Sequence, residues 1–249
     1  ILNMSRDAER VTSLTIEGSY NSSGVQDFST PTVIRSNPAA GGSSSTLMRV
    51  ETKDKDVIME GVTFVNNDPA GNGIGANVGE GGTLTMKNTA FRHNNGYGLG
   101  LEQYGKTLIA NTLFADGGDG LLIRSNGNAP EIVVVNNTFA NNNGADITGQ
   151  PTGIYNSLSW NNGVQNLVTD DMLMNVSFPD GTDNNDIDNG PNFVSPDNGD
   201  YRLRPGMTLL NREGTDALYL QHVGIAADAE GETDLAGTPR KVDRATDIG

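Results

Sequence analysis

The sequence predicts an all-β fold, built as a parallel solenoid in which each stretch of about 20–27 residues forms one coil. Three observations support this prediction. A motif that ends in Phe returns at that interval, short apolar runs flank each copy, and no segment shows helical periodicity. Strands that recur once per period are typical of solenoids, because every coil stacks its hydrophobic positions on those of the coil before it.

The repeating motif is clearest in "NNTF" (136–139). Other copies are "GVTF" (61–64), "NTAF" (88–91), "NTLF" (111–114) and the degenerate "NSLS" (156–159). An Asn- or Gly-rich turn follows each copy, and then a second run: "GIGAN" (73–77), "GLGLE" (98–102), "GLLIR" (120–124) and, one residue out of frame, "ADITG" (145–149). Each unit therefore reads as strand, Asn/Phe corner, Asn-Gly turn and strand. A meander of hairpins is the rival interpretation, because Asn-Gly is a strong hairpin signal.

The return of one residue type per period favours stacked coils over hairpins, and it predicts the core. We expect two inward columns: Met59, Met86, Ile109, Val134 and Ile154, and Ile74, Leu99, Leu121, Ile147 and Leu167. The Phe residues are expected to stack inside. Asn is expected at the corners, because Asn and Gly tolerate positive φ best, and its amide can bond to the coils above and below. These Asn residues thus belong to the fold rather than to a ligand site.

Composition narrows the function classes. The 249 residues carry a formal net charge of −15, which argues against nucleic acid and anionic membrane surfaces as partners. Cys is absent, so disulfides, thiolate metal ligands and Cys nucleophiles are excluded. No apolar run approaches the roughly 20 residues that span a bilayer. The chain opens and stops within its pattern, so we expect it to be trimmed at both ends.

With these motifs in view, the chain resembles right-handed parallel β-helix proteins of the pectate-lyase-like superfamily. Its "FxxN" units at 64–67, 91–94 and 139–142 resemble those of polymorphic outer-membrane proteins of the chlamydial type, although the companion "GGA[ILV]" tetrapeptide is absent. Towards the C-terminus, "DYRL" (200–203), "DLAGTPR" (234–240) and "DIG" (247–249) resemble the choice-of-anchor segment of secreted bacterial β-helix proteins. The resemblance implies a bacterial protein that is secreted or anchored at the cell surface.

We expect two parts in the chain. Residues 1–172 form the β-helix coils, trimmed at the N-terminus, and residues 173–249 form an irregular, turn-rich segment that packs on the solenoid or caps it. A solenoid end exposes apolar core and needs a cover. Apolar residues of the C-terminal segment are expected to cover that end or to lie along a face: Phe193, Tyr201, Leu203, Leu209 and Leu210.

Candidate catalytic residues are Arg124, Glu102 and Asp119. The resemblance implies two chemistries for this fold: elimination with Ca²⁺ and an Arg or Lys base, and hydrolysis by clustered carboxylates. Glu102 and Arg124 fall in one outward column, where a surface ion pair is the simpler interpretation. Asp119 belongs to a small acidic patch expected with Asp116 and Asp146. Any cleft is expected beside the loops 66–73 and 124–131.

The remaining candidates concern ligands. Trp160 and Tyr97 are candidate aromatic contacts for a sugar, with Trp160 either partly exposed or covered by the C-terminal segment. Asp183, Asp186 and Asp188 offer hard oxygen ligands for Ca²⁺ in a turn-rich loop, and no other cofactor is expected. The hypothesis is a non-enzymatic, adhesin-like or carbohydrate-binding module whose partner is a glycan or another surface protein. The alternative is a polysaccharide lyase or glycoside hydrolase.

Overall fold

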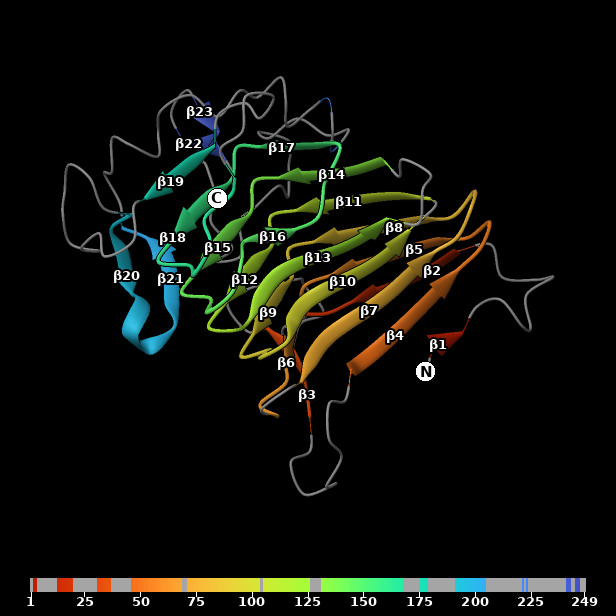
Figure 1. The fold of residues 1–249 in the computed structure, drawn as a ribbon, viewed down its shortest axis with the longest axis horizontal. Helices are drawn as coiled ribbons and strands as arrows, with labels where there is room; N and C mark the ends of the chain where they lie inside the picture. The colour runs from red at the N-terminus through yellow and green to blue at the C-terminus, as the bar shows by residue number, and fades with distance from the viewer. Residues whose placement is uncertain are drawn as a thin grey trace.

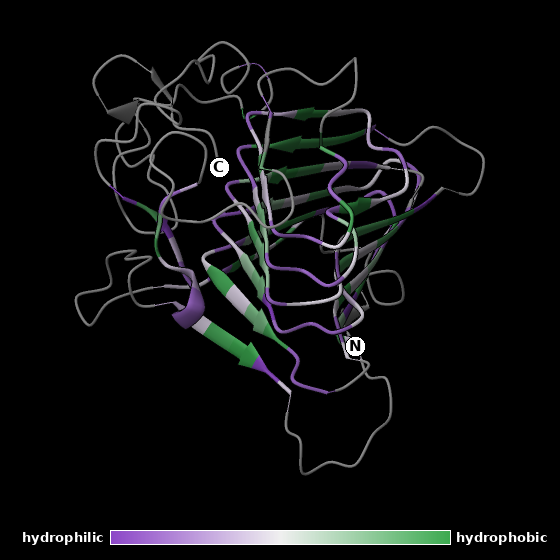
Figure 2. Cartoon of the chain, turned by 60° about the vertical axis from the view of Figure 1, so that its left-hand side comes forward, coloured by the Kyte–Doolittle hydropathy of each residue, from purple (hydrophilic) through white to green (hydrophobic). Residues whose placement is uncertain are grey.

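The computed structural model describes residues 2–3, 13–19, 31–36, 46–68, 71–103, 105–125, 131–167, 175–178 and 191–204, with 221, 223, 241–242 and 245–246. In this part of the chain three parallel sheets enclose an apolar interior, and each full coil gives one strand to each sheet (Figure 1). The predicted all-β solenoid is confirmed. Hydrophobic strands stack along its length, and the corners that join them are largely hydrophilic (Figure 2).

The strands of each sheet come from successive coils. Sheet A contains β1 (Leu2–Asn3), β4 (Thr46–Thr52), β7 (Asn72–Val78), β10 (Tyr97–Gln103), β13 (Asp119–Ser125) and β16 (Ile147–Thr148). Sheet B contains β2 (Ser13–Glu17), β5 (Asp56–Glu60), β8 (Thr83–Lys87), β11 (Lys106–Ala110), β14 (Glu131–Val135) and β17 (Gly153–Tyr155). Sheet C contains β3 (Thr32–Arg35), β6 (Val62–Val65), β9 (Ala90–Arg92), β12 (Leu113–Ala115), β15 (Thr138–Ala140), β18 (Leu158–Trp160) and β19 (Val176–Phe178). The parallel pairing therefore continues past residue 172.

The expected repeat unit of two strands and an Asn/Phe corner was wrong in one respect, because each coil contains a third strand that belongs to sheet C. The Phe of each motif lies in the middle of a sheet C strand, as Phe91 does in β9 and Phe139 in β15. The corner is the Asn three residues before the Phe. These strands are only three residues long, so their alternation was too short to be separated from the turns on either side.

The two predicted inward columns are confirmed by the strand register. Met59 pairs with Met86, and Ile109 pairs with Met86 on one side and Val134 on the other. All members of both columns are buried in one hydrophobic cluster: Met59, Met86, Ile109, Val134 and Ile154, with Ile74, Leu99, Leu121, Ile147 and Leu167. The core is therefore continuous along the described coils.

The Phe stack is also confirmed. The rings of Phe64, Phe91, Phe114 and Phe139 are stacked with centroids 5.3, 5.1 and 4.8 Å apart. A row of glycines in sheet A makes room for them: a Cβ at Gly98 would lie 2.9 Å from the Phe114 ring, and one at Gly120 would lie 2.6 Å from the Phe139 ring. Real Cβ atoms do not approach ring carbons so closely, so the aromatic stack requires this glycine row.

Positive φ angles mark two columns of corners. The predicted corners Asn88, Asn111, Asn136 and Asn156 have φ between 49° and 55°. A second column follows the sheet C strands: His93, Asp116, Asn141 and Asn161 have φ between 52° and 57°. The second bend is thus made by the residue two positions after the Phe, not by the glycine of Asn-Gly. Buried amides join the coils as expected, for example Asn142 Nδ2 to Asn162 Oδ1 at 3.0 Å.

A short antiparallel hairpin lies along the outer face of sheet C (Figure 1). It consists of β20 (Phe193–Ser195) and β21 (Asp200–Leu203), joined by a 3₁₀ turn at Pro196–Asn198. Phe193, Tyr201 and Leu203 pack against outward side chains of sheet C. Leu209 and Leu210 lie outside the described residues. A separate antiparallel pair joins β22 (Lys241–Val242) and β23 (Ala245–Thr246).

Candidate functional site

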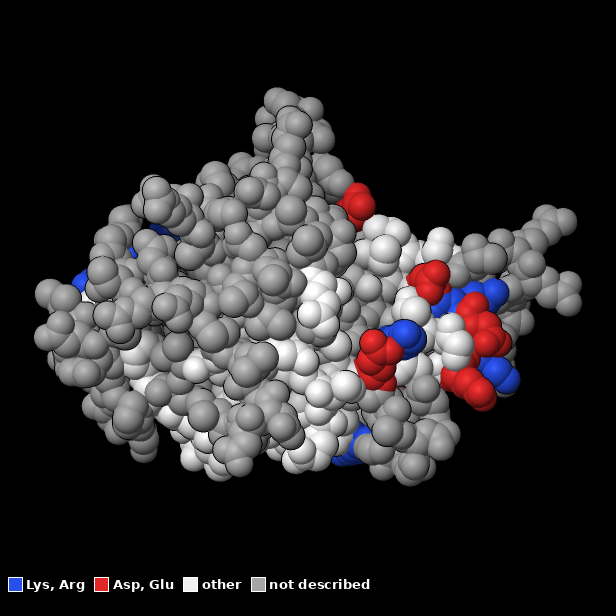
Figure 3. Space-filling model, turned by 90° about the horizontal axis from the view of Figure 1, so that it is seen from above, with Lys and Arg blue, Asp and Glu red and all other residues white. Residues whose placement is uncertain are grey.

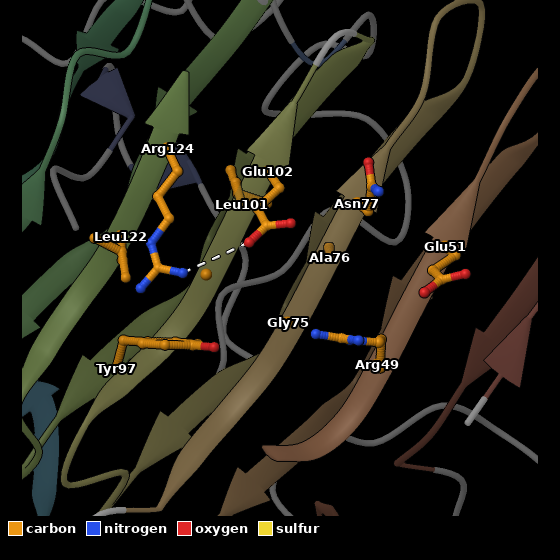
Figure 4. Close-up of a pocket in the computed structure, with 11 residues that line it drawn as sticks. Arg49, Glu51, Gly75, Ala76, Asn77, Tyr97, Leu101, Glu102, Leu122 and Arg124 are labelled. Carbon is orange, nitrogen blue, oxygen red and sulfur yellow. Dashed lines mark ion pairs between the residues drawn. The ribbon is translucent and has the colours of Figure 1, made fainter. Parts of the chain in front are cut away.

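The candidate site is a shallow pocket on the outer face of sheet A (Figure 4). Two rows of register partners build it. One row consists of Arg49, Gly75, Gly100 and Leu122, and the next consists of Glu51, Asn77, Glu102 and Arg124. Inward neighbours such as Val50 and Leu101 are fully buried and fix the strands beneath, so the outward side chains stand on a rigid floor.

Tyr97 forms one wall of this pocket. A Cβ at Gly100 would lie 2.5 Å from the Tyr97 ring, so the ring lies flat against that glycine, and its hydroxyl reaches towards Gly75. Tyr97 and Arg49 point towards one another from opposite sides of β7 (Figure 4). The two glycines are the reason why the aromatic ring can lie along the sheet, because a side chain at Gly100 would fill the space that the ring occupies.

The charged groups of the pocket are locally balanced. Arg124 Nη1 lies 3.5 Å from Glu102 Oε1, and the two side chains are 60% and 50% exposed. Arg49 and Glu51 add one positive and one negative charge from β4, which lies two strands away from the β10 strand that carries Glu102. The predicted surface ion pair between Glu102 and Arg124 is thus present. An exposed pair of this kind contributes little to stability, about 0–1 kcal/mol.

Asp119, the third candidate catalytic residue, does not join the pocket. Its Oδ1 accepts a hydrogen bond from the backbone N–H of Ala145 at 2.9 Å, and its Oδ2 accepts one from Thr148 Oγ1 at 3.1 Å. Both donors belong to the following coil. The carboxylate therefore holds two coils together and has neither an Arg nor a second carboxylate among these partners.

The acidic patch expected from Asp116, Asp119 and Asp146 is not observed, because the three carboxyl groups have different hydrogen-bonding partners. Asp116 faces sheet C, where it pairs with Arg92 at 3.1 Å, and Asp146 is fully buried inside the solenoid. Burial raises the pKa of the Asp146 carboxyl to about 7, although hydrogen bonds from the Asn166 backbone and Ser159 act in the opposite direction. The register places Asp146 opposite Gly120, at the level that the sequence predicted.

Trp160 lies under the hairpin. Its ring meets Phe193 edge to face with centroids 5.6 Å apart, and the side chain is only 9% exposed. Of the two candidate aromatic contacts, the structure therefore leaves Tyr97 at a pocket and covers Trp160. Of the five candidate catalytic and aromatic residues, Tyr97, Glu102 and Arg124 come together.

The metal candidates Asp183, Asp186 and Asp188 lie outside the described residues. Within the described ranges, no three His, Cys, Asp or Glu side chains are grouped so that they could hold a metal ion. The view onto the solenoid from above shows acidic and basic side chains interspersed over the N-terminal coils (Figure 3). No helix in the described part combines the length and hydrophobicity needed to cross a membrane.

Comparison with known families decides the class of this chain. The family described as right handed beta helix region matches residues 1–175. The chain belongs to this family. The match covers more than half of the sequence and coincides with the three parallel sheets, so the right-handed β-helix expected from the sequence is confirmed. No curated protein and no solved structure matched the chain.

The sequence did not point to Arg49 and Glu51. They lie in β4, which precedes the first recognisable Phe motif, so no corner fixed their register. The sequence did contain a signal for them, the alternation of apolar and charged residues in β4. Met48 and Val50 alternate with Arg49 and Glu51 in the same way as Ile74 and Ala76 alternate with their neighbours in β7. Extending the register back by one coil from "GIGAN" would have placed both charges beside Tyr97.

Proposed function

We propose that this β-helix protein is an exported, adhesin-like module that binds carbohydrate on the outer face of sheet A. The observation that carries the proposal is the Tyr97 ring, which lies flat over Gly100 with its hydroxyl towards Gly75, in a pocket that Arg49 and the Glu102–Arg124 pair also line. An aromatic ring lined by a few convergent polar groups is the usual composition of a sugar site, because the ring contacts the apolar face of the sugar and the polar groups bond its hydroxyls.

The arginines suit a carboxylate or hydroxyl group of the same glycan. Arg presents planar donors that match a carboxylate, and Arg49 and Arg124 flank the ring on either side. The sequence resemblance supports a bacterial protein that is secreted or anchored at the cell surface. A surface location also agrees with the net charge of −15, which suits an acidic, solvated exterior.

A hydrolase or lyase is the second candidate function. Glu51 and Glu102 are separated by one strand, and two strand spacings of about 4.8 Å put their backbones roughly 10 Å apart. Inverting glycosidases place two carboxyl groups about 6.5–9.5 Å apart. Glu102, however, is half exposed and paired with Arg124, whereas a general acid is usually desolvated so that it keeps its proton. Binding therefore agrees better with the pocket than catalysis does.

The test is a glycan array with the full chain, followed by calorimetric titration of any ligand found. Both neutral and uronate polymers should be present, with and without Ca²⁺. Tyr97→Ala is expected to weaken binding at least tenfold, and Tyr97→Phe is expected to retain most of it, because stacking depends on the ring rather than on its hydroxyl.

The matched control is Tyr155→Ala. Tyr155 also folds over a glycine of its own strand, Gly153, but on the outer face of sheet B. Its removal should leave binding unchanged. Equal losses in both variants would contradict the site. Release of unsaturated or reducing sugars by the wild-type chain, abolished in Glu102→Gln, would establish the enzymatic alternative instead.

A further inference from the structure

The aromatic stack and the glycine row end together. In sheet C, Ser159 is the register partner of Phe139 and so takes the place of the next Phe. In sheet A, Asp146 precedes Ile147, the partner of Leu121, and so takes the place of the next Gly.

The two replacements contact each other as the residues they replace do. Gly120 lies against the Phe139 ring, and in the following coil Asp146 Oδ1 accepts a hydrogen bond from Ser159 Oγ at 2.9 Å. A polar pair has thus been substituted for a Gly–Phe pair at one level of the core.

This pair is completely enclosed. Asp146 and Ser159 are both 0% exposed. The second carboxyl oxygen accepts the backbone N–H of Asn166 at 2.9 Å, and Ser159 Oγ accepts Asn162 Nδ2 at 3.1 Å. The carboxyl group therefore has good hydrogen bonds but no cation among the described parts of the chain, and a charge in that position would be poorly compensated.

Among the residues that the structure describes, the surrounding elements bring no charged group into the interior. Among the described residues, β13 presents Leu121, β15 presents Phe139, and the segment after β18 presents Asn162, Asn166 and Leu167. The charged group of β13 at this level is Asp119, which bonds to Ala145 and Thr148 on either side of the buried position. Burial accordingly raises the pKa of Asp146 to about 7 from an ordinary 3.8.

The outer side of the same coil carries the hairpin. Trp160 directly follows Ser159, and its ring packs edge to face on Phe193 of β20. The titratable and charged groups at the hairpin's edge include Arg92, Asp116 and Tyr201, together with the Asp200–Arg202 ion pair on β21. Burial and the neighbouring Asp116 carboxylate raise the pKa of the Tyr201 hydroxyl well above its usual range, so it does not ionise near neutral pH.

We propose that the Asp146–Ser159 pair makes this coil a pH-sensitive joint, which keeps the C-terminal hairpin docked while the carboxyl group is protonated and loosens it when the carboxyl group ionises. When Asp146 is protonated, its hydrogen bond with Ser159 reverses so that the carboxyl O–H donates to Ser159 Oγ, and the other carboxyl oxygen still accepts the Asn166 N–H. An ionised Asp146 needs water, and we expect water to reach it when the coil behind Trp160 opens. Because the folded-state pKa is raised, the stabilisation is complete below about pH 4 and is lost as pH rises through about 7.

The single Trp of the chain reports on this joint directly. Trp160 emission and thermal unfolding of the full chain should be followed from pH 5 to pH 9. For the wild type we expect a red shift of the emission with a midpoint near pH 7 and a melting temperature that is several degrees lower at pH 9 than at pH 5. Asp146→Asn should abolish both changes, because its amide can donate to Ser159 and accept from Asn166 without ever ionising.

A second variant keeps the test decisive if the first fails to fold. Asp146→Gly combined with Ser159→Phe rebuilds the Gly–Phe pair of the earlier coils and should also lack the transition. Ser159→Phe alone should be strongly destabilised, because the ring would meet the Asp146 carboxyl group.

Two controls separate this joint from other titrations. His93→Asn replaces an exposed corner residue by the type found in the same column at Asn141, and Glu131→Gln removes a carboxylate that is 53% exposed. Both should keep the wild-type transition. A transition that persists in Asp146→Asn, or wild-type emission that stays constant from pH 5 to pH 9, would overturn the proposal.

Discussion

The outer faces of sheets A and C are built in the same way, but one carries an open pocket and the other is covered by a hairpin. Both consist of outward rows in parallel register above the same apolar core. On sheet C the row contains Ala115, Ala140, Trp160 and Phe178, and the β20–β21 hairpin covers it. On sheet A the corresponding rows contain glycines, a Tyr and four charged side chains that line a pocket. Two faces of one parallel solenoid thus differ in their outward residues: one is covered by a hairpin, and the other keeps a pocket.

The largest effect is expected where both faces depend on one residue. Phe114→Ala removes one of the two inner rings of the aromatic stack and leaves a cavity beneath sheets A and C. We expect a loss of about 3–5 kcal/mol in the free energy of unfolding, measured by denaturant titration. Sugar binding and hairpin docking should be lost together. If only one face were affected, the coils would not share one cooperative core.

A smaller loss, confined to sheet C, is expected for Phe193→Ala. The ring is fully buried between Trp160 and Tyr201, with centroids 5.6 and 5.4 Å away. Its removal should cost about 2–4 kcal/mol and shift Trp160 emission to the red, because the hairpin can undock while the solenoid stays folded. Tyr97-dependent binding serves as the control and should be unchanged.

Tyr201→Phe isolates the polar part of the same contact. The Tyr201 hydroxyl donates a hydrogen bond to Asp116 Oδ1 at 2.5 Å. The same carboxylate also accepts hydrogen bonds from the side chains of Arg92 and Asn141. Loss of one hydrogen bond to a charged acceptor should cost about 1–2 kcal/mol in thermal or chemical unfolding. Asp116→Asn should give a comparable loss, and the double variant should lose less than the sum, since the two residues form one contact.

The smallest effect on stability is expected on sheet A. Glu102→Gln removes an exposed ion pair and should change the free energy of unfolding by less than about 0.5 kcal/mol. Ligand binding should change more than stability does. A loss of stability as large as that of Tyr201→Phe would mean that the pocket is a structural contact like the one on sheet C.

The sequence predicted the solenoid and its core columns because one Phe and one corner Asn per coil fix the register of everything between them. It also predicted the Glu102–Arg124 pair, since both residues follow such corners at the same distance. The level of Asp146 beside Gly120 was predicted as well, but its burial was missed, because no glycine or Phe marks the coil in which both were replaced. The sequence left undecided whether Trp160 is exposed or covered. Its cover, Phe193, lies 33 residues further along the chain, and no local pattern encodes a contact over that distance.

The second column of corners has a consequence for how such a chain can change. His93, Asp116, Asn141 and Asn161 hold nearly the same backbone angle although their side chains differ in charge and size. The backbone thus offers one substitutable position per coil, and successive positions are about 4.8 Å apart because the sheet sets that spacing. At Asp116 this freedom has been used to attach Tyr201, a residue 85 positions further along the chain. New attachments can arise at the neighbouring corners by single substitutions, without any rearrangement of the coils.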